Sequence, residues 1–182
     1  MLMKLWMESK VKKISVKPNS PDNMAFDSES VLDKVGWQLL RALQEDARLS
    51  FSELGRRVGL SSPAVAERVR RMEDMGIVAG YRATIDPTRL GFPTLAFIHL
   101  RLNGDQYARV AAMARNLSEI IECHHVTGID CFLFKVLVSS PAHLEAVIAQ
   151  LRTFGQTSSS IVLSSPVKSK MLLSGPSVRI EP

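Results

Sequence analysis

The stretch from Phe51 to Tyr81 constrains this chain most, and it reads FSELGRRVGLSSPAVAERVRRMEDMGIVAGY. Two short segments with helical periodicity are separated by a turn at Gly59, a residue type that tolerates a positive φ. The second segment opens on Ser-Pro and carries arginines along one side. This pattern is typical of a helix-turn-helix, whose second helix enters the major groove of DNA.

The second helix is predicted from its ends and its periodicity. Ser62 is the expected N-cap, because its hydroxyl can accept from a helical N–H that has no partner. Pro63 then falls at the first helical position, where a missing donor costs nothing, and Gly76 is the expected C-cap. The residues expected in the core are Leu54, Val58 and Leu60 from the first helix and turn, and Val65, Val69 and Met72 from the second.

The opposite side of this second helix is the candidate DNA-binding surface. A helix N-terminus attracts phosphate, and arginine side chains bind phosphate or the edges of guanine. The alternative is a solvated amphipathic helix in which Glu67 and Glu73 neutralise Arg70 and Arg71. Arg68 lies at the border of the surface, where pairing with a carboxylate is its second option. The turn, the Ser-Pro start and the partner helix favour DNA.

Composition limits how DNA is bound. The 182 residues carry a formal net charge of +5, which permits nucleic acid without requiring it. Residues 33–82 hold nine Lys or Arg against seven Asp or Glu, a net of +2. Binding is therefore expected to depend on a few placed arginines and on dimerisation.

The two cysteines suit a reducing cytoplasm. No apolar run is long enough to cross a bilayer, and the first residues lack the order of charged and apolar segments that a signal peptide has.

The chain is predicted to divide into five parts. Residues 1–28 are interpreted as a flexible extension, with an arm that touches DNA or a partner as the alternative. Residues 29–82 form the DNA-binding domain, which opens with a helix from Ser30 to Glu45 that Gly36 and Trp37 interrupt. A linker over 83–91, a second domain over 92–170 and a tail over 171–182 follow.

The second domain alternates strands and helices. Strands are expected over 92–102, 120–127, 131–139 and 158–163, and helices over 105–117 and 141–154. This β-α-β-β-α-β order predicts a ferredoxin-like sheet with both helices on one face. Apolar positions on both sides of residues 131–138 indicate that a second chain covers the other face, and hence a homodimer. The fold class is α+β, a helix-turn-helix (winged-helix-like) domain followed by a ferredoxin-like effector and dimerisation domain.

The segment LDKVGWQLLRALQEDARLSFSELGRRVGLSSPAVAERVRRMEDMGIVAGYRATIDPTRLGF resembles the opening of the Lrp/AsnC (feast/famine) transcriptional regulators. The later VTGIDCFLFKV and SSSIVLSSPVKSK resemble their effector domain, so the resemblance covers roughly residues 30–170. It implies a sequence-specific regulator of double-stranded DNA that forms dimers and then tetramers or octamers. It also implies a small effector, usually an amino acid, bound in the second domain between subunits.

The resemblance also carries over particular residues. The recognition helix corresponds to Ser62–Met75, and an effector loop follows the second strand of the second domain. The residues at the DNA-facing surface are Ser61, Ser62, Pro63, Ala64, Glu67, Arg68, Arg70 and Arg71, of which Arg70 comes from the helical periodicity alone. The residues of the effector loop are Thr127, Gly128, Ile129, Asp130 and Cys131.

Two positions depart from the family pattern. Gly36 stands where the family commonly has Asp, a change expected to weaken local helix contacts and to leave DNA recognition alone. The effector loop commonly reads Gly-x-x-Asp, which places Asp at position 131, but here that residue is Cys131 and Asp130 lies one residue early. Because strand side chains alternate, Asp130 need not point where the family's carboxylate does. A carboxylate is the natural partner for the ammonium group of an amino acid. Another ligand, or none, is therefore favoured over a common amino acid bound in the usual way.

Metal, redox and enzymatic functions are the remaining alternatives. Cys123, His124, His125 and Cys131 are of zinc-binding type, but no CxxC pair exists, so packing or surface roles are favoured over a metal site or a redox-sensing thiol. No cofactor is expected, and no hydrolase, phosphate-loop or dinucleotide motif occurs in the chain. A tetrapyrrole (sirohaem-type) decarboxylase, for which His99, Arg101 and His124 are hints, and a low-specificity nucleoid-organising protein are the alternatives to a regulator.

Overall fold

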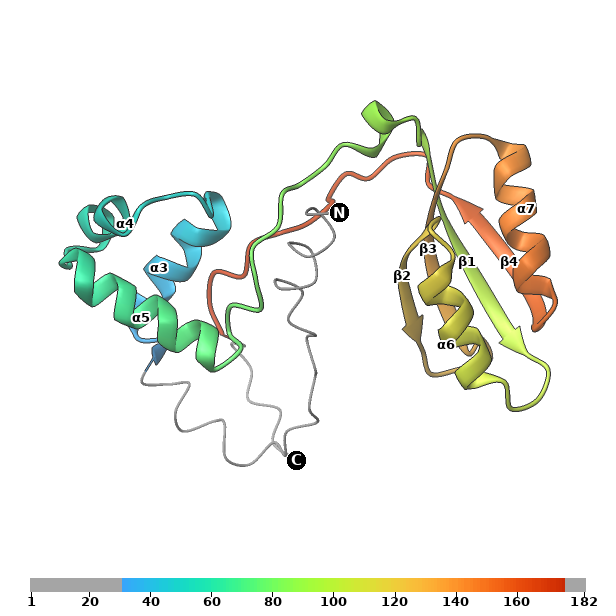
Figure 1. Cartoon of the computed structure of the whole chain (residues 1–182), viewed down its shortest axis with the longest axis horizontal. Helices are drawn as coiled ribbons and strands as arrows, with labels where there is room; N and C mark the ends of the chain where they lie inside the picture. The colour runs from blue at the N-terminus through green and yellow to red at the C-terminus, as the bar shows by residue number, and fades with distance from the viewer. Residues whose placement is uncertain (1–30, 176–182) are drawn as a thin grey trace, which may run out of the picture. The chain divides into compact units, whose positions relative to one another are not determined.

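The computed structural model describes residues 31–175. The predicted extension over 1–28 and the end of the tail lie outside these residues. Two compact units are present: residues 31–81 together with 171–175, and residues 82–170 (Figure 1). Within the described part of the chain, no helix is both long and apolar enough to span a membrane.

Three helices form the first unit: α3 (Lys34–Glu45), α4 (Phe51–Val58) and α5 (Ser62–Asp74). Of the residues predicted to face its core, Leu54, Val65 and Met72 are fully buried, Val69 is almost so, and Val58 and Leu60 are half-buried against the same core. Leu39 of α3 is fully buried with them. No strand occurs within residues 31–81, so the motif has a plain helix-turn-helix form here. Together these three helices bury one apolar cluster, whose further members are Val31, Ala42 and Leu43.

The start of α3 differs from the prediction. The helix begins at Lys34 rather than Ser30, because the Asp33 carboxylate accepts a hydrogen bond from the Gly36 N–H at 2.7 Å and caps it. Gly36 and Trp37 lie inside α3 and do not interrupt it. A Cβ on Gly36 would lie 2.0 Å from the Val31 carbonyl oxygen, so the backbone leaves no room for a side chain there. The absence of the family's Asp at position 36 therefore matches the path of the chain before α3.

The turn between α4 and α5 follows the prediction. Ser50 caps α4 by accepting from the Glu53 N–H at 3.1 Å. Gly59 ends α4 with φ +73°, the left-handed conformation that glycine adopts without steric cost. This turn places the buried side of α5 against α4 and α3.

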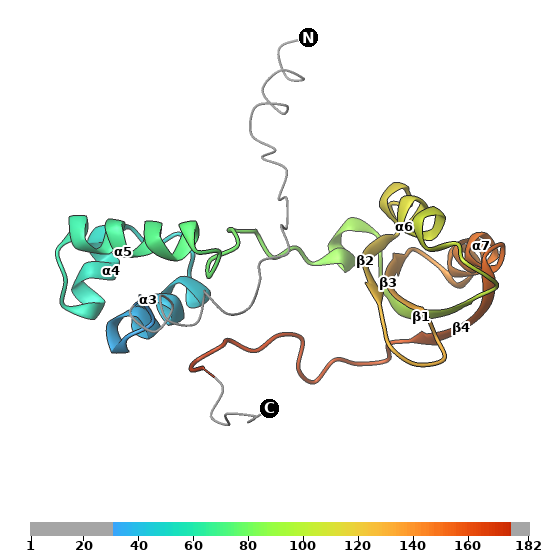
Figure 2. The same cartoon turned by 90° about the horizontal axis from the view of Figure 1, so that it is seen from below.

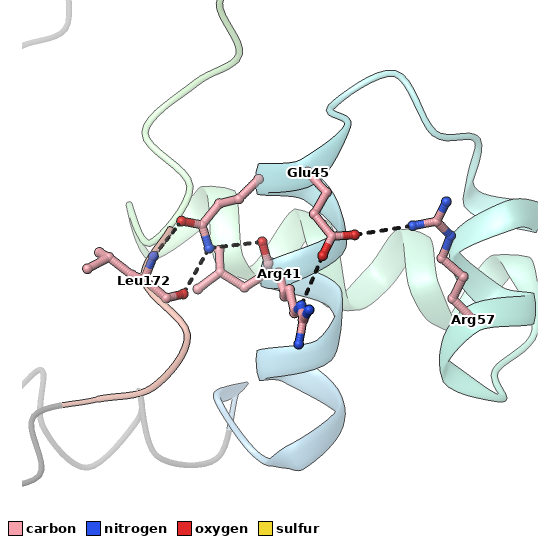
Figure 3. A network of polar contacts seen from close by, with 6 residues as sticks. Arg41, Glu45, Arg57 and Leu172 are labelled. Atoms are coloured by element: carbon pink, nitrogen blue, oxygen red, sulfur yellow. Dashed lines mark hydrogen bonds and ion pairs between the residues drawn. The ribbon is translucent and has the colours of Figure 1, made fainter. Parts of the chain in front are cut away.

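The chain returns to the first unit after the second. The side-chain amide of Gln44, on α3, exchanges two hydrogen bonds of 2.9 Å with the N–H and carbonyl of Leu172 (Figure 3). At the next residue of α3, Glu45 pairs with Arg41 at 2.9 Å and with Arg57 of α4 at 3.6 Å. Residues 171–175 thus belong to the DNA-binding unit, where the sequence predicted only a tail.

A four-stranded antiparallel sheet organises the second unit. Its elements are, in chain order, η2 (Pro87–Leu90, a 3-10 helix), β1 (Thr94–Leu102), α6 (Tyr107–Asn116), β2 (Ile120–His125), β3 (Phe132–Val138), α7 (Pro141–Arg152) and β4 (Gly155–Ile161). The strand order is β2-β3-β1-β4, and both α6 and α7 lie on one face of the sheet (Figure 2). The predicted ferredoxin-like β-α-β-β-α-β order is confirmed.

Several predicted boundaries in this unit were wrong by a few residues. β1 begins two residues later than expected, and β4 begins at Gly155 rather than at Ser158. The early start of β4 has a steric reason, since a Cβ on Gly155 would lie 2.0 Å from the Arg101 carbonyl oxygen of β1. The close approach of these strands depends on a residue more than fifty positions away in the chain, which local periodicity does not reveal.

The two faces of the sheet differ. Side chains toward α6 and α7 form the core, and they include Ile98, Leu100, Phe132, Phe134 and Val136, all almost fully buried. The opposite face, called the outer face below, carries alternating side chains that are only half-buried. On β1 and β3 these are Leu95, Phe97, His99, Leu133, Lys135 and Leu137.

Candidate DNA-binding surface and effector region

Helix α5 begins one residue earlier than predicted. Ser61 rather than Ser62 is the N-cap, so Ser62 is the first helical residue and Pro63 the second. The Ser61 side chain makes no capping hydrogen bond, and its hydroxyl is exposed. At the other end Met75 is the C-cap, and Gly76 follows with φ +70°.

The predicted DNA-facing residues lie away from the buried stripe of α5. Val65, Val69 and Met72 face the core, which turns the remaining side chains of the helix outward. The exposed members of the predicted set are Ser61, Ser62, Pro63, Glu67, Arg70 and Arg71, and the half-buried members are Ala64 and Arg68.

The three arginines of this surface have different partners. Arg68 forms two hydrogen bonds with the Asp33 carboxylate, at 2.9 and 3.0 Å, which is the pairing that the sequence left open. This guanidinium holds the pKa of Asp33 below its usual value, together with the Gly36 N–H. Arg70 lies 3.6 Å from Asp74 in a largely exposed pair. Arg71 forms no ion pair within residues 31–175.

Glu73 does not neutralise these arginines. Its carboxylate accepts a hydrogen bond of 2.8 Å from the Tyr81 hydroxyl. Burial first, and then Glu73, raise the pKa of Tyr81 to about 12. Because Glu73 is engaged with Tyr81, the guanidinium of Arg71 stays available at the surface of α5.

The predicted effector loop joins β2 to β3. Asp130 points to the outer face of the sheet, where its Oδ2 lies 3.3 Å from His99 Nδ1. Cys131 is half-buried and packs against the core, and its N–H donates to the Leu100 carbonyl at 2.9 Å. Position 131 thus holds a half-buried thiol, while the loop's carboxylate lies on the outer face beside His99.

A cavity of about 310 Å³ lies between α6 and β2, outside that loop. Sequence reasoning missed it, because that reasoning followed only the buried stripe of α6. A signal was present: Tyr107, Ala111 and Arg115 recur every four residues along a second side of the helix. The residues that line the cavity are Tyr107, Ala111, Ala114 and Arg115 of α6, Ile120, Ile121, Glu122, Cys123 and His125 of β2, and Phe132 of β3.

The cysteine and histidine residues do not gather into a metal site. Register pairs Cys123 with Phe134 and His125 with Phe132, so both point to the helix side, whereas His124 pairs with Leu133 of the outer face. No group of three His, Cys, Asp or Glu side chains suitable for a metal occurs among residues 31–175. Burial raises the pKa of the Cys123 thiol, which disfavours the reactive thiolate.

The residues that hinted at a decarboxylase are not brought to this cavity. His99 and Arg101 share the outer face by strand alternation, and His124 lies there beside Glu122 at 3.3 Å. The cavity opens on the other side of the sheet, and neither histidine lines it.

A helix-turn-helix unit with an exposed arginine on its second helix, joined to a ferredoxin-like unit, defines a two-domain DNA-binding regulator. Comparison with known proteins identifies the family. Residues 32–73 match the AsnC-type helix-turn-helix domain, and residues 95–172 match the Lrp/AsnC ligand binding domain. The chain belongs to the Lrp/AsnC family of transcriptional regulators.

Individual relatives agree with this assignment. The chain is 31% identical over 133 residues to the HTH-type transcriptional regulator LrpC of Bacillus subtilis. The aligned region covers 73% of this chain and 92% of LrpC. It is 40% identical over 110 residues to the leucine-responsive regulatory protein of Salmonella typhimurium, covering 59% of this chain and 67% of that protein.

Solved structures show the same fold. The structure of Bacillus subtilis LrpC superposes with a TM-score of 0.73 at 30% identity, over 76% of this chain and 99% of that one. A transcriptional regulator of Neisseria meningitidis, solved as a complex with L-Met, superposes with a TM-score of 0.71 at 30% identity, over 78% and 96% of the two chains. The regulator function is thereby favoured over the decarboxylase alternative.

Proposed function

We propose that this protein is a dimeric regulator that presents two α5 helices to a pseudo-palindromic DNA site and responds to a small metabolite. In such a dimer the half-sites are about one helical turn apart, roughly 34–36 Å. The observation that carries the DNA part is the outward side of α5, where Arg71 is exposed and unpaired within residues 31–175 while three apolar residues fix the helix to the core.

Each predicted surface residue has a physical role in this proposal. The N-terminal turn of α5, with Ser61, Ser62, Pro63 and Ala64, approaches the phosphates through its unpaired N–H groups and dipole. Arg71 and Arg70 reach phosphate or base edges, and Glu67 accepts from cytosine N4. Arg68 holds the helix to Asp33 and contacts DNA only if that pair opens.

The dimer is proposed to form through the outer face of the sheet. Phe97, Leu133 and Leu137 are apolar and only half-buried there, and a second copy of the chain would remove them from water. Further assembly into tetramers or octamers is proposed by family membership. The effector is an amino acid or a related metabolite, and the neisserial relative with bound L-Met supports this class. A DNA-binding regulator of this kind works in the cytoplasm, and we propose no catalytic role for it.

Selection of bound fragments from the genome, followed by footprinting, tests the proposal. We expect a recurring pseudo-palindromic motif and an operator affinity that Arg71→Ala weakens by about 1–3 kcal/mol, the usual value of a base-reading arginine. Arg41→Ala is the matched control, because Arg41 is an exposed arginine on α3 that pairs with Glu45. Binding across many sites without a motif and with steep salt dependence would favour a nucleoid-organising protein instead. No DNA binding at all would refute both.

A further inference from the structure

The cavity between α6 and β2 runs along the helix α6. Tyr107, Ala111 and Arg115 line it at successive helical turns, so an arginine stands at one end and an aromatic ring at the other. Eight residues of α-helix place their Cα atoms about 12 Å apart along the axis. Between these two ends, Ala111 and Ala114 have small side chains that leave the cavity open, and this cavity is called the groove below. The volume of 310 Å³ is at the lower end of the range of small-molecule sites, about 300–1,000 Å³.

The aromatic end of the cavity is a cluster of three rings. The Tyr107 ring centroid lies 5.0 Å from that of His125, in an edge-to-face arrangement, and 5.3 Å from that of Phe132. Such a cluster offers both ring faces and ring edges to an apolar ligand group. Tyr107 is 49% exposed, so a bound apolar group would bury surface that water now covers.

The other end of the cavity carries an uncompensated positive charge. Arg115 forms no ion pair or side-chain hydrogen bond within residues 31–175, whereas Arg109 on the same helix bonds to Gln106 and lies over the Phe154 ring. The lining residue Glu122 does not balance Arg115, because its carboxylate bonds to Lys135 at 2.8 Å and to His124 at 3.3 Å. An arginine at the end of a groove that also holds aromatic rings suits a ligand carboxylate, which it can bind with two parallel hydrogen bonds.

No carboxylate of the effector loop reaches this groove. Asp130 lies on the outer face of the sheet with His99, and neither Asp130 nor Cys131 lines the groove. The carboxylate that does line the groove, Glu122, is already bonded to Lys135 and His124, so the ammonium group of an α-amino acid would lose water there without gaining a free anionic partner.

We propose that the groove between α6 and β2 is the effector site of this protein, and that it takes an organic carboxylate with an apolar or aromatic chain and no ammonium group. Arg115 binds the carboxylate, and Tyr107, His125 and Phe132 contact the apolar end. This inference rests on the proposed regulator function, and it narrows the effector from an amino acid or a related metabolite to a related carboxylate.

Three probes with one carbon skeleton test it by calorimetric titration of the full chain. Hydrocinnamate has the carboxylate alone, phenylalanine adds the ammonium group, and hydrocinnamamide has neither charge. We expect hydrocinnamate to bind at least tenfold more tightly than either of the others. Arg115→Gln should remove that preference, while the matched control Arg109→Gln, whose side chain lies outside the groove, should keep it.

A second variant guards against loss of folding in the first. Ala111→Trp fills the groove from α6 and should abolish hydrocinnamate binding. The variant should keep the cooperative thermal unfolding of the parent protein. Tighter binding of phenylalanine, equal binding of acid and amide, or unchanged binding by Arg115→Gln would each overturn the proposal. DNA affinity is measured on the same samples: DNA binding without probe binding refutes the ligand class alone, and loss of DNA binding refutes the regulator proposal.

Discussion

Gln44 and Leu172 are joined by a pair of hydrogen bonds in which one side-chain amide satisfies both backbone groups of the other residue. The Gln44 Nε2 donates to the Leu172 carbonyl at 2.9 Å, and its Oε1 accepts from the Leu172 N–H at 2.9 Å (Figure 3). The same Nε2 also lies 3.2 Å from the Leu40 carbonyl within α3. The segment after the ligand binding domain therefore has a specific attachment on the DNA-binding unit.

Gln44→Ala should release this segment. Each lost hydrogen bond is expected to cost about 0.5–1.5 kcal/mol at most, because both groups can bond to water instead. We expect the Leu172 amide to exchange with deuterium faster in the variant, with the core amides of α3 unchanged. Gln38→Ala is the control, since Gln38 is an exposed glutamine on the same helix. Equal exchange at Leu172 in both variants would show that the attachment contributes nothing in solution.

Gly36→Ala should destabilise the DNA-binding unit. The new methyl group would meet the Val31 carbonyl oxygen at 2.0 Å, so the backbone before α3 must move. Overpacking of this kind typically costs about 1–3 kcal/mol, more than the gain in helix propensity of up to about 1 kcal/mol. Urea unfolding checks this, and Gly36→Asp, which restores the common family residue, should be at least as destabilised. A variant more stable than the parent would mean that the chain before α3 has room to shift.

The Arg68–Asp33 pair is expected to contribute modestly to stability. Both side chains are partly exposed, at 33% and 42%, and pairs of this kind are worth about 0–1 kcal/mol. A double-mutant cycle with Arg68→Ala and Asp33→Asn measures the coupling by denaturant unfolding. If Arg68 also binds DNA, Arg68→Ala should weaken operator binding by more than Asp33→Asn changes it. Equal effects of the two substitutions on DNA affinity would leave Arg68 with a structural role only.

Comparison of sequence with structure separates local signals from distant ones. The buried stripe of α5 and the positive φ of Gly59 were predictable, because helical periodicity and glycine chemistry act within a few residues. The start of β4 at Gly155 was not, since its reason is the Arg101 carbonyl oxygen on a neighbouring strand. For the site, the effector loop was predicted from the family resemblance, whereas the groove beside Arg115 depends on the packing of α6 on β2, which local periodicity does not reveal.

Glu119 makes the stability of the ligand binding domain depend on pH in the acidic range. The His143 ring nitrogen Nε2 lies 2.9 Å from the Glu119 carboxylate, and Nδ1 accepts from the Ser139 N–H at 3.3 Å. The hydrogen bond from His143 is the main reason that the pKa of Glu119 lies below its ordinary value of 4.5. The resulting stabilisation is present above pH 4.5 and is lost as the pH falls through the lower folded-state pKa.

Glu119→Gln should therefore lower the free energy of unfolding at neutral pH and reduce its fall between neutral and strongly acidic pH. Urea titrations across this range measure both effects. Glu145→Gln is the control, because Glu145 is exposed on α7 and forms no ion pair within residues 31–175. An unchanged pH dependence in Glu119→Gln would show that another carboxylate dominates the acid response.

Phe97→Asp should dissociate the proposed dimer. Phe97 lies on the outer face, opposite Lys135 of β3 in the register and Ser160 of β4, and is half-buried in the single chain. A carboxylate there would have to lose its water against the second copy, at a cost of several kcal/mol. Analytical ultracentrifugation should show a monomer, and operator binding should fall because one chain presents a single α5 helix. Ala146→Asp, an exposed position on α7 across the sheet, is the matched control and should stay dimeric. If both variants remain dimers and bind the operator like the parent, the chains associate through a different surface.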